Sequence, residues 1–369
     1  MKISIEEACE ILDSQRIPIT ASKRQSGIYP YYGANGIQDY VADYIFDDEL
    51  VLLAEDGGNF GSTDKPIAYR VSGKCWVNNH AHVLKPKKEL NVDYLCYALM
   101  FYDVRSLIKG ATRQKLTQAA MRKIMIPLLP MKEQLHISGI LNKIYELIEL
   151  HNQQIAKLDE LVKSRFIELF GTVKDNPYHF PTATLKEVCH KITDGKHGGC
   201  EQETDSGYYY VGAREIYDGV IHYDTAPQIT YADFAKDYRR CNVEQGDMVI
   251  VNTGATIGKS AIASSPLTER TLLQKSVALI KVKTDVISAK FLRYCYMANP
   301  SMYMVESASA QPNLLLSKMN ATVIYLPPIE LQEQFAAFVE QVDKSKLAVQ
   351  KSLDEIETLK KSLMQQYFG

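Results

Sequence analysis

The sequence contains one pattern written twice, and this internal repeat limits the fold more than any other feature. The segment "VLLAEDGGNFGST" (51–63) aligns with "MVIVNTGATIGKS" (248–260), which places Gly57 on Gly254, 197 positions away (254 − 57), and Gly61 on Gly258. Each segment is an apolar run followed by a glycine-containing turn, which is typical of a buried strand that ends in a tight loop. A period this long indicates a duplicated domain rather than a solenoid of short repeats.

The repeat extends over the whole chain. Near the start, "SIEEACEIL" (4–12) matches "TLKEVCHKI" (184–192), and near the end of each copy "LLPMKEQLHISGI" (128–140) matches "LPPIELQEQFAAF" (326–338). The offset is 179 at Gly33 and Gly212 (212 − 33) but 197 at Gly57 and Gly254, so the second copy carries an insertion. We place that insertion within residues 221–242.

The stretch "VIVNTGATIGKS" (249–260) invites comparison with a phosphate-binding P-loop. A P-loop has four residues between its first glycine and the Gly-Lys pair, whereas three separate Gly254 from Gly258. The first copy reads Gly61, Ser62, Thr63 where the second reads Gly258, Lys259, Ser260, so the shared feature is the glycines rather than the lysine. We interpret the stretch as a strand and turn, and a nucleotide-dependent enzyme is the alternative.

Composition narrows the class of protein. The chain has 369 residues, enough for two or three domains, and a formal net charge of −2, which gives no general attraction to nucleic acid or membrane. Its seven cysteines form no CxxC pair, so a reducing, cytoplasmic location without disulfides is expected. No run approaches the ~18 apolar residues of a membrane span. Cys75, His80 and His82 lie close in "CWVNNHAH", but their alternation favours a strand, so we expect no metal and no cofactor.

Each copy has a strand-rich part followed by a long helix, which predicts an α+β fold. Short β-branched and aromatic segments between Gly, Asn and Asp turns predict the strands, and residues 92–108 and 288–299 are expected to be helical. The predicted boundaries are residues 1–127 and 172–325 for two recognition domains, and residues 128–171 and 326–369 for two long helices.

Apolar residues with alternating four-three spacing mark both long helices. The first stripe contains Ile137, Leu141, Ile144, Ile148, Ile155, Leu158 and Val162, and the second contains Val339, Val342, Val349, Leu353, Ile356 and Leu363. Two such stripes in one chain would bury each other in an antiparallel coiled coil with a pseudo-two-fold axis. Helices of ~36–40 residues would span about 55–60 Å. The alternative is two core helices in separate domains.

A protein with two similar binding domains held apart would fit duplex DNA, whose grooves recur about every 34 Å. The candidate base-reading or phosphate-binding residues are polar or basic side chains in turn-rich stretches. In the first copy they are Lys23, Arg24, Gln25, Asn35, Asn59, Asn78, Asn79, Arg113 and Gln114, and in the second Lys196, His197, Arg214, Arg239, Arg240, Asn252, Lys259, Gln311 and Asn313. Since the net charge is close to zero, either these cations gather on one face or a partner supplies phosphate contacts. A coiled-coil adaptor that does not bind DNA is a further alternative.

The doubled pattern resembles the specificity (S) subunit of type I restriction–modification systems. The resemblance is carried by "GATRQKLTQAAMRKIMIPLLPMKEQ" (110–134) and "QIAKLDELVKSRFIELFG" (154–171), with their partners at 326–345 and 353–369. It implies two target-recognition domains that bind a bipartite, asymmetric site in double-stranded DNA, and a coiled coil that sets the gap. It further implies docking of two methyltransferase (M) subunits and of restriction/translocase (R) subunits, with no catalysis by this chain. A specificity subunit of another multi-subunit restriction enzyme is the nearest alternative.

Overall fold

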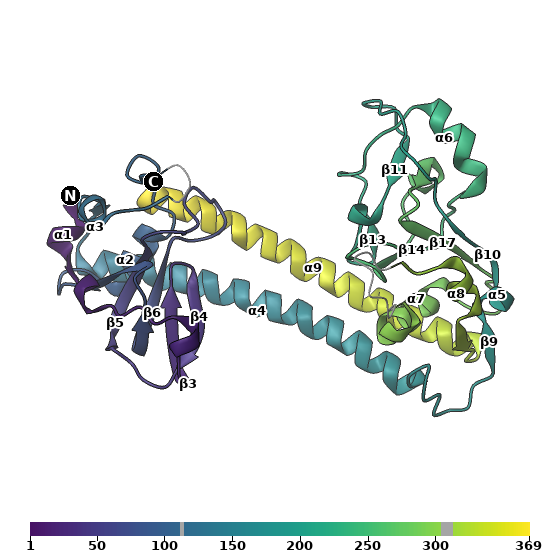
Figure 1. Ribbon diagram of the computed structural model, residues 1–369, viewed down its shortest axis with the longest axis horizontal. Coiled ribbons are helices and arrows are strands. Elements are labelled where there is room, and N and C mark those ends of the chain that lie inside the picture. The colour runs from purple at the N-terminus through teal and green to yellow at the C-terminus, as the bar shows by residue number, and fades with distance from the viewer. Residues whose placement is uncertain (111–113, 304–312) are drawn as a thin grey trace. The chain divides into compact units, whose positions relative to one another are not determined.

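The computed structural model describes residues 1–110, 114–303 and 313–369. The chain forms two compact units, the first made of Met1–Asn152 with Gln350–Gly369 and the second of Gln153–Val349. The two longest helices, α4 (Met131–Phe170) and α9 (Ile329–Phe368), have 40 residues each and contribute to both units (Figure 1). Two of the predicted DNA-binding residues, Arg113 and Gln311, lie outside the described residues.

The first unit is built on a sheet with the strand order β2-β7-β5-β6-β3-β4. Its neighbouring strands are antiparallel except β3 and β6, which are parallel, and a separate antiparallel pair joins β1 to β8. The elements are β1 (Lys2–Ser4), α1 (Ile5–Ala8), β2 (Cys9–Ile11), β3 (Ser26–Gly33), β4 (Gly36–Val41), β5 (Phe46–Ala54), β6 (Ala68–Val77), β7 (Ala81–Pro86), α2 (Val92–Met100), α3 (Gln118–Met121) and β8 (Met125–Pro127).

The second unit repeats four neighbouring strands of this sheet. Its main sheet has the order β10-β17-β14-β15, which corresponds to β2-β7-β5-β6, and β9 pairs with β18 as β1 does with β8. The insertion predicted within 221–242 contains helix α6. The elements are β9 (Thr182–Thr184), α5 (Leu185–Val188), β10 (Cys189–Asp194), β11 (Tyr209–Val211), β12 (Ile216–Tyr217), β13 (Val220–Ile221), α6 (Tyr231–Asp237), β14 (Met248–Val251), β15 (Ser260–Ile262), β16 (Thr271–Leu273), β17 (Val277–Val282), α7 (Ala289–Ala298), α8 (Leu316–Ala321) and β18 (Val323–Tyr325).

A buried glutamine attaches each long helix to its unit. Gln134 near the start of α4 and Gln332 near the start of α9 are both 0% exposed, and they occupy equivalent positions of the repeat. Each side-chain oxygen accepts a backbone N–H, and each side-chain nitrogen donates to a carbonyl in the turn before the helix. These partners are Asn91 N (2.8 Å) and Leu129 O (2.8 Å) for the first, and Ser288 N (2.9 Å) and Pro327 O (2.9 Å) for the second.

The two predicted stripes meet within each unit. In the first unit, Ile137 and Leu141 of α4 lie in the same apolar core as Ile356 and Leu363 of α9. In the second unit, Leu158 and Val162 of α4 share a core with Val339 and Val342 of α9. The start of one helix therefore packs beside the end of the other, which is an antiparallel arrangement in each unit.

The stripes are more than a seam between two helices. Every predicted stripe position is buried or half-buried, but Ile137, Leu141 and Ile144 also pack against the sheet and α2 of the first unit. Val339 and Val342 have the same role in the second unit, beside Phe166 and Phe291. The outer turns of both helices thus belong to the cores of the two units. The alternative prediction, that the stripes belong to core helices of separate domains, therefore holds for part of each stripe.

The helix predicted at 92–108 is too long, since α2 ends at Met100. The physical reason is a local turn at Asp103, whose carboxylate accepts hydrogen bonds from the Arg105 backbone N–H (3.0 Å) and guanidinium (2.7 Å). Such side-chain to backbone bonds compete with helical hydrogen bonds. The other helix, predicted at 288–299, is present as α7.

The glycine turn after β14 is not a phosphate cradle. A P-loop leads into a helix, but this turn leads into strand β15. Its backbone is already used, because Gly258 N–H donates to the Val251 carbonyl (2.9 Å) and Lys259 N–H to that of Thr256 (3.1 Å). Both glycines have positive φ, at 101° for Gly254 and 90° for Gly258, and a Cβ at Gly258 would strike the Tyr303 ring. The glycines therefore serve the turn itself.

In the part of the chain that the structure describes, no helix is both long and apolar enough to cross a membrane.

Candidate nucleic-acid interface

Four segments of the first unit meet at the point where the central strand β5 ends. They are residues 33–36, 55–61, 78–80 and 114–118, and we call them the loop end of the first unit. Glu55 N–H donates to the His80 carbonyl (2.9 Å) and the Glu55 carbonyl accepts from Leu116 N–H (2.7 Å). Asn35 Nδ2 donates to the Gly57 carbonyl (2.9 Å). Residues that are far apart in sequence thus form one surface.

The second unit forms an equivalent loop end from residues 212–214, 252–258, 274–276 and 313–316. Asn252 N–H donates to the Ser276 carbonyl (3.0 Å), and Leu314 N–H donates to the Asn252 carbonyl (2.7 Å). These are the same backbone hydrogen bonds as in the first unit, at corresponding positions of the two sheets. The two loop ends therefore share a backbone framework.

The side chains on this shared framework differ between the units. Polar or charged residues occupy most of the equivalent positions, but their identity changes. The pairs, with the first unit given first, are Asn35 and Arg214, Glu55 and Asn252, Asp56 and Thr253, Asn79 and Lys275, and Lys115 and Asn313. Two frameworks of this kind would present different hydrogen-bond donors and acceptors to a ligand.

Several predicted DNA-binding residues lie on these loop ends with exposed side chains. They are Asn35, Asn79 and Gln114 in the first unit, and Arg214 and Asn313 in the second. Lys259, which directly follows residues 252–258, is exposed as well. Lys275 is exposed at the same surface and was missed by the sequence reasoning. Its correspondence with Asn79 follows from the strand pairs His82–Leu53 and Ala278–Ile250, which the sequence alone did not give.

Two predicted base readers, Asn78 and Asn252, are buried, at 3% and 4% exposed. Asn78 Nδ2 donates to Gln38 Oε1 (3.1 Å) and its Oδ1 accepts the His80 N–H (2.8 Å). The structure therefore favours a supporting role for both side chains rather than direct contact with bases. Asn59 is half-buried and donates to the Pro66 carbonyl (3.3 Å).

Three predicted residues, Lys23, Arg24 and Gln25, lie away from the loop end of the first unit. They precede β3, and the Gln25 carbonyl accepts the N–H of Ala42, beyond the far end of the β3–β4 hairpin (2.9 Å). The Arg24 guanidinium pairs with Asp39 (3.2 Å) and lies over the Tyr31 ring. These residues form a second group, separate from the loop-end candidates.

Acidic partners neutralise much of the positive charge predicted for the second unit. Lys196 is paired with Asp237 of α6 (2.8 Å). His197 and Arg240 both bind Asp194, at 2.8 Å and 2.6 Å. Burial alone would raise the pKa of the Asp194 carboxyl, but these two hydrogen bonds hold it below its usual value. Arg239 is exposed beside them.

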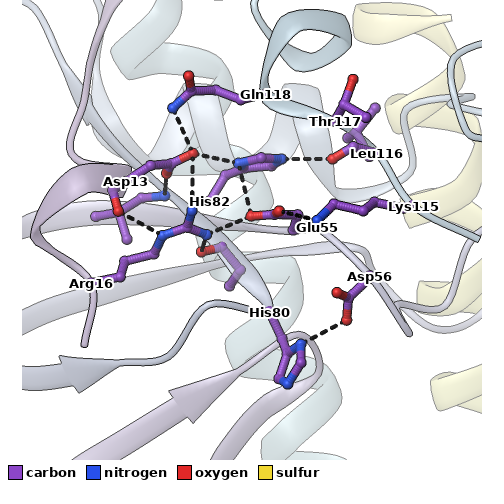
Figure 2. Close-up of polar contacts among 12 residues, drawn as sticks. Asp13, Arg16, Glu55, Asp56, His80, His82, Lys115, Leu116, Thr117 and Gln118 are labelled. Atoms are coloured by element: carbon purple, nitrogen blue, oxygen red, sulfur yellow. Dashed lines mark hydrogen bonds and ion pairs between the residues drawn. The ribbon is translucent and has the colours of Figure 1, made fainter. Parts of the chain in front are cut away.

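Figure 2 shows a network of charged side chains beneath the loop end of the first unit. Glu55 accepts from Arg16 Nη1 (2.6 Å) and pairs with Lys115 Nζ (2.8 Å), while His82 Nδ1 lies 2.7 Å from Asp13 Oδ2. His82 is 0% exposed. Burial alone would raise the pKa of Glu55, but the bonds from Lys115 and Arg16 lower it overall. The sequence reasoning missed this network, apart from naming His82.

The network has the residue types of a metal site but is already satisfied by protein groups. Ligand atoms of Asp13, Glu55 and His82 lie within 4.8 Å of one another. However, Arg16 and Lys115 neutralise the two carboxylates, which removes the electrostatic reason to bind a cation. Cys75, His80 and His82, which lie close together in the sequence, do not form a metal site either. Cys75 is buried in an apolar cluster, and His80 pairs with Asp56 (2.7 Å).

Comparison with known proteins identifies the sequence family. The family model described as "Type I restriction modification DNA specificity domain" matches residues 1–160 and 178–358. A type I restriction enzyme specificity subunit of Methanocaldococcus jannaschii is 23% identical over 98% of this chain and 90% of its own length. A putative specificity subunit of Haemophilus influenzae is 40% identical, but over 37% of this chain and 35% of the relative.

Solved structures show the same fold. An S subunit of a type I restriction-modification system from M. genitalium is 16% identical and gives a TM-score of 0.63, with 100% of this chain and 96% of the other covered. A chain from a study of complex assembly and conformational transition of the type I R-M system gives a TM-score of 0.57 at 17% identity, with 100% and 97% covered. At these identities the likeness concerns the fold alone.

Proposed function

Because the chain belongs to the type I restriction–modification DNA specificity family, we propose that it recognises a bipartite, asymmetric DNA site. Each unit binds one half of the site through its loop end. Specificity subunits are the non-catalytic members of their complexes, so the chain supplies sequence recognition and other subunits supply the chemistry.

One observation carries this proposal: the two loop ends have the same backbone hydrogen bonds but different polar side chains. Arginine and lysine suit guanine, whereas asparagine and glutamine suit adenine. The first loop end exposes Asn35, Asn79, Gln114 and Lys115, and the second exposes Arg214, Lys275 and Asn313. One framework with two sets of donors is what recognition of two unlike half-sites requires.

We further propose that α4 and α9 act together as the spacer between residues 1–127 and 172–325. A 40-residue helix is about 60 Å long. In each unit the stripes of both helices pack into the core, and a buried glutamine attaches one helix end. Because both helices are fixed in this way, the pair would set a constant gap between the half-sites.

The outer faces of the long helices are suited to docking of two M subunits. Leu161 of α4 and Leu359 of α9 are equivalent in the repeat, 198 positions apart (359 − 161), and they are 48% and 50% exposed. Leu150 and Leu347 are also exposed. Because the two exposed leucines are equivalent, each of two identical M subunits could make the same apolar contact with the chain. Docked M subunits would supply the phosphate contacts that a chain of net charge −2 lacks, and R subunits would join that complex.

A domain exchange tests the proposal. Residues 1–127 are replaced by the recognition domain of another specificity subunit, and binding of the assembled S–M complex is measured on duplexes in which either half-site is altered. We expect the preferred sequence to change in one half and the gap to stay constant. The matched control replaces residues 172–325 and should change the other half. Changes in both halves from one exchange, or binding independent of sequence, would contradict the proposal.

A further inference from the structure

The buried histidine of the charged network makes two hydrogen bonds to acceptors. His82 Nδ1 lies 2.7 Å from Asp13 Oδ2, and its Nε2 lies 2.8 Å from the carbonyl oxygen of Leu116. A neutral imidazole has one donor and one acceptor, whereas an imidazolium has two donors. A carbonyl oxygen cannot donate, so Nε2 carries a proton and donates it to Leu116.

Asp13, on the other side of the ring, is itself held by several donors. Burial alone would raise the pKa of its carboxyl, but the hydrogen bond from His82 and the Val83 N–H (2.9 Å) hold it below the usual value. Gln118 Nε2 also donates to it, at 3.0 Å. Asp13 thus accepts hydrogen bonds from Val83 and Gln118 while it contacts Nδ1, which fixes the orientation of the His82 ring.

The two bonds of His82 connect strand β7 with the segment 114–118. Leu116 accepts from the ring, and its own N–H donates to the Glu55 carbonyl (2.7 Å). Gln118 in the same segment reaches Asp13, and Lys115 pairs with Glu55 (2.8 Å). The segment is therefore held at three residues, Lys115, Leu116 and Gln118, and Gln114 at its start is exposed on the loop end.

The second unit lacks this arrangement. In the first unit His82 pairs across the sheet with Leu53, and at the equivalent place Ala278 pairs with Ile250. Ala278 is 0% exposed, as His82 is. The shared sheet thus accepts an alanine at this position, and the charged network is a property of the first unit.

From this geometry we propose that His82 is a positioning residue that determines which half-site the first unit recognises, because its ring holds segment 114–118 through the hydrogen bond from Nε2 to Leu116. This inference rests on the proposed function. His82 does not touch DNA, because it is fully buried. The charged groups around the ring are Asp13 beyond β2, Glu55 at the end of β5, Arg16, and Lys115 of the segment itself.

The test uses the full chain in its S–M complex, with His82→Ala and the conservative His82→Gln, which can keep one of the two bonds. Hydrogen exchange is measured at residues 114–118, and binding is measured on duplexes altered in either half-site. Losing one charge-assisted hydrogen bond corresponds to roughly a tenfold effect. We expect exchange of the Leu116 amide to rise about tenfold and discrimination in the first half-site to fall about tenfold. His82→Gln should lie between His82→Ala and the wild type.

Three further results separate the outcomes. The exposed His190→Ala in the second unit is the control and should change neither measurement. In the unmodified protein, the nitrogen NMR spectrum of the His82 ring should show a proton on Nε2, which tests the inference even if the variants do not fold. A ring without a proton on Nε2, or discrimination lost equally in both half-sites, would overturn it. If the unmodified complex shows no sequence preference, the proposed function fails, while the exchange and ring measurements still judge the role of His82 in holding the segment.

Discussion

Replacing Gln134 by alanine should loosen the attachment of α4 to the first unit. The side chain is 0% exposed and makes three hydrogen bonds, to Asn91 N (2.8 Å), Glu89 O (2.9 Å) and Leu129 O (2.8 Å). A buried hydrogen bond contributes about 1 kcal/mol net. We therefore expect the free energy of unfolding of the first unit to fall by roughly 3 kcal/mol.

Native-state hydrogen exchange measures this loss unit by unit. Amides of Met1–Asn152 should exchange faster in Gln134→Ala, while the second unit keeps its protection. The equivalent Gln332→Ala should give the reverse pattern. Gln154, on the exposed side of the same helix, is the control, and its alanine variant should change stability by less than about 0.5 kcal/mol. If Gln134→Ala behaves like the control, the buried glutamine does not attach the helix and the rigid-spacer argument loses its support.

Three other predictions concern the core, acid stability and DNA binding. Phe166→Ala should destabilise the second unit by about 3–5 kcal/mol in thermal unfolding, since the ring is 0% exposed. The alanine variant of Met364, the equivalent and half-buried residue, should lose less stability. Equal losses of stability in the two variants would contradict this packing. Because the pKa of Glu55 is lowered in the folded state, its contribution to stability is present above the unfolded value of about 4.3 and is lost as pH falls through the folded one. Denaturant titrations between about pH 3 and 6 should therefore show acid destabilisation of the first unit that Glu55→Gln reduces, and an unchanged profile would refute it. Lys259→Ala should weaken DNA binding similarly for all sequences and reduce the salt dependence by about one charge; loss of ATP binding in this variant would instead revive the nucleotide-dependent alternative.

The sequence predicts the elements of the fold well, because their signals are local or periodic. The apolar runs before Gly57 and Gly254 are β5 and β14, and the four-three stripes are the buried faces of α4 and α9. The predicted helix at 92–108 failed where a single carboxylate, Asp103, formed a competing turn. The spacing of apolar residues in a sequence does not reveal such a local hydrogen bond.

The candidate site was harder to predict, because its contacts join residues far apart in the chain. Asn78 and exposed Asn79 are neighbours in sequence, and only the fold separates the buried side chain from the exposed one. The charged network joins Asp13 to His82 and Gln118, 69 and 105 positions away. The acidic partners of Lys196 and Arg240 were hidden in the same way. Polar composition therefore located the loops but could not show which side chains are available.

Sequencing of methylated DNA from cells that carry this gene with its M subunit tests the central claim most directly. We expect one modified motif in two unlike parts, separated by a gap of constant length whose bases are not specified. A continuous motif, a palindrome, or two half-sites at variable spacing would contradict it.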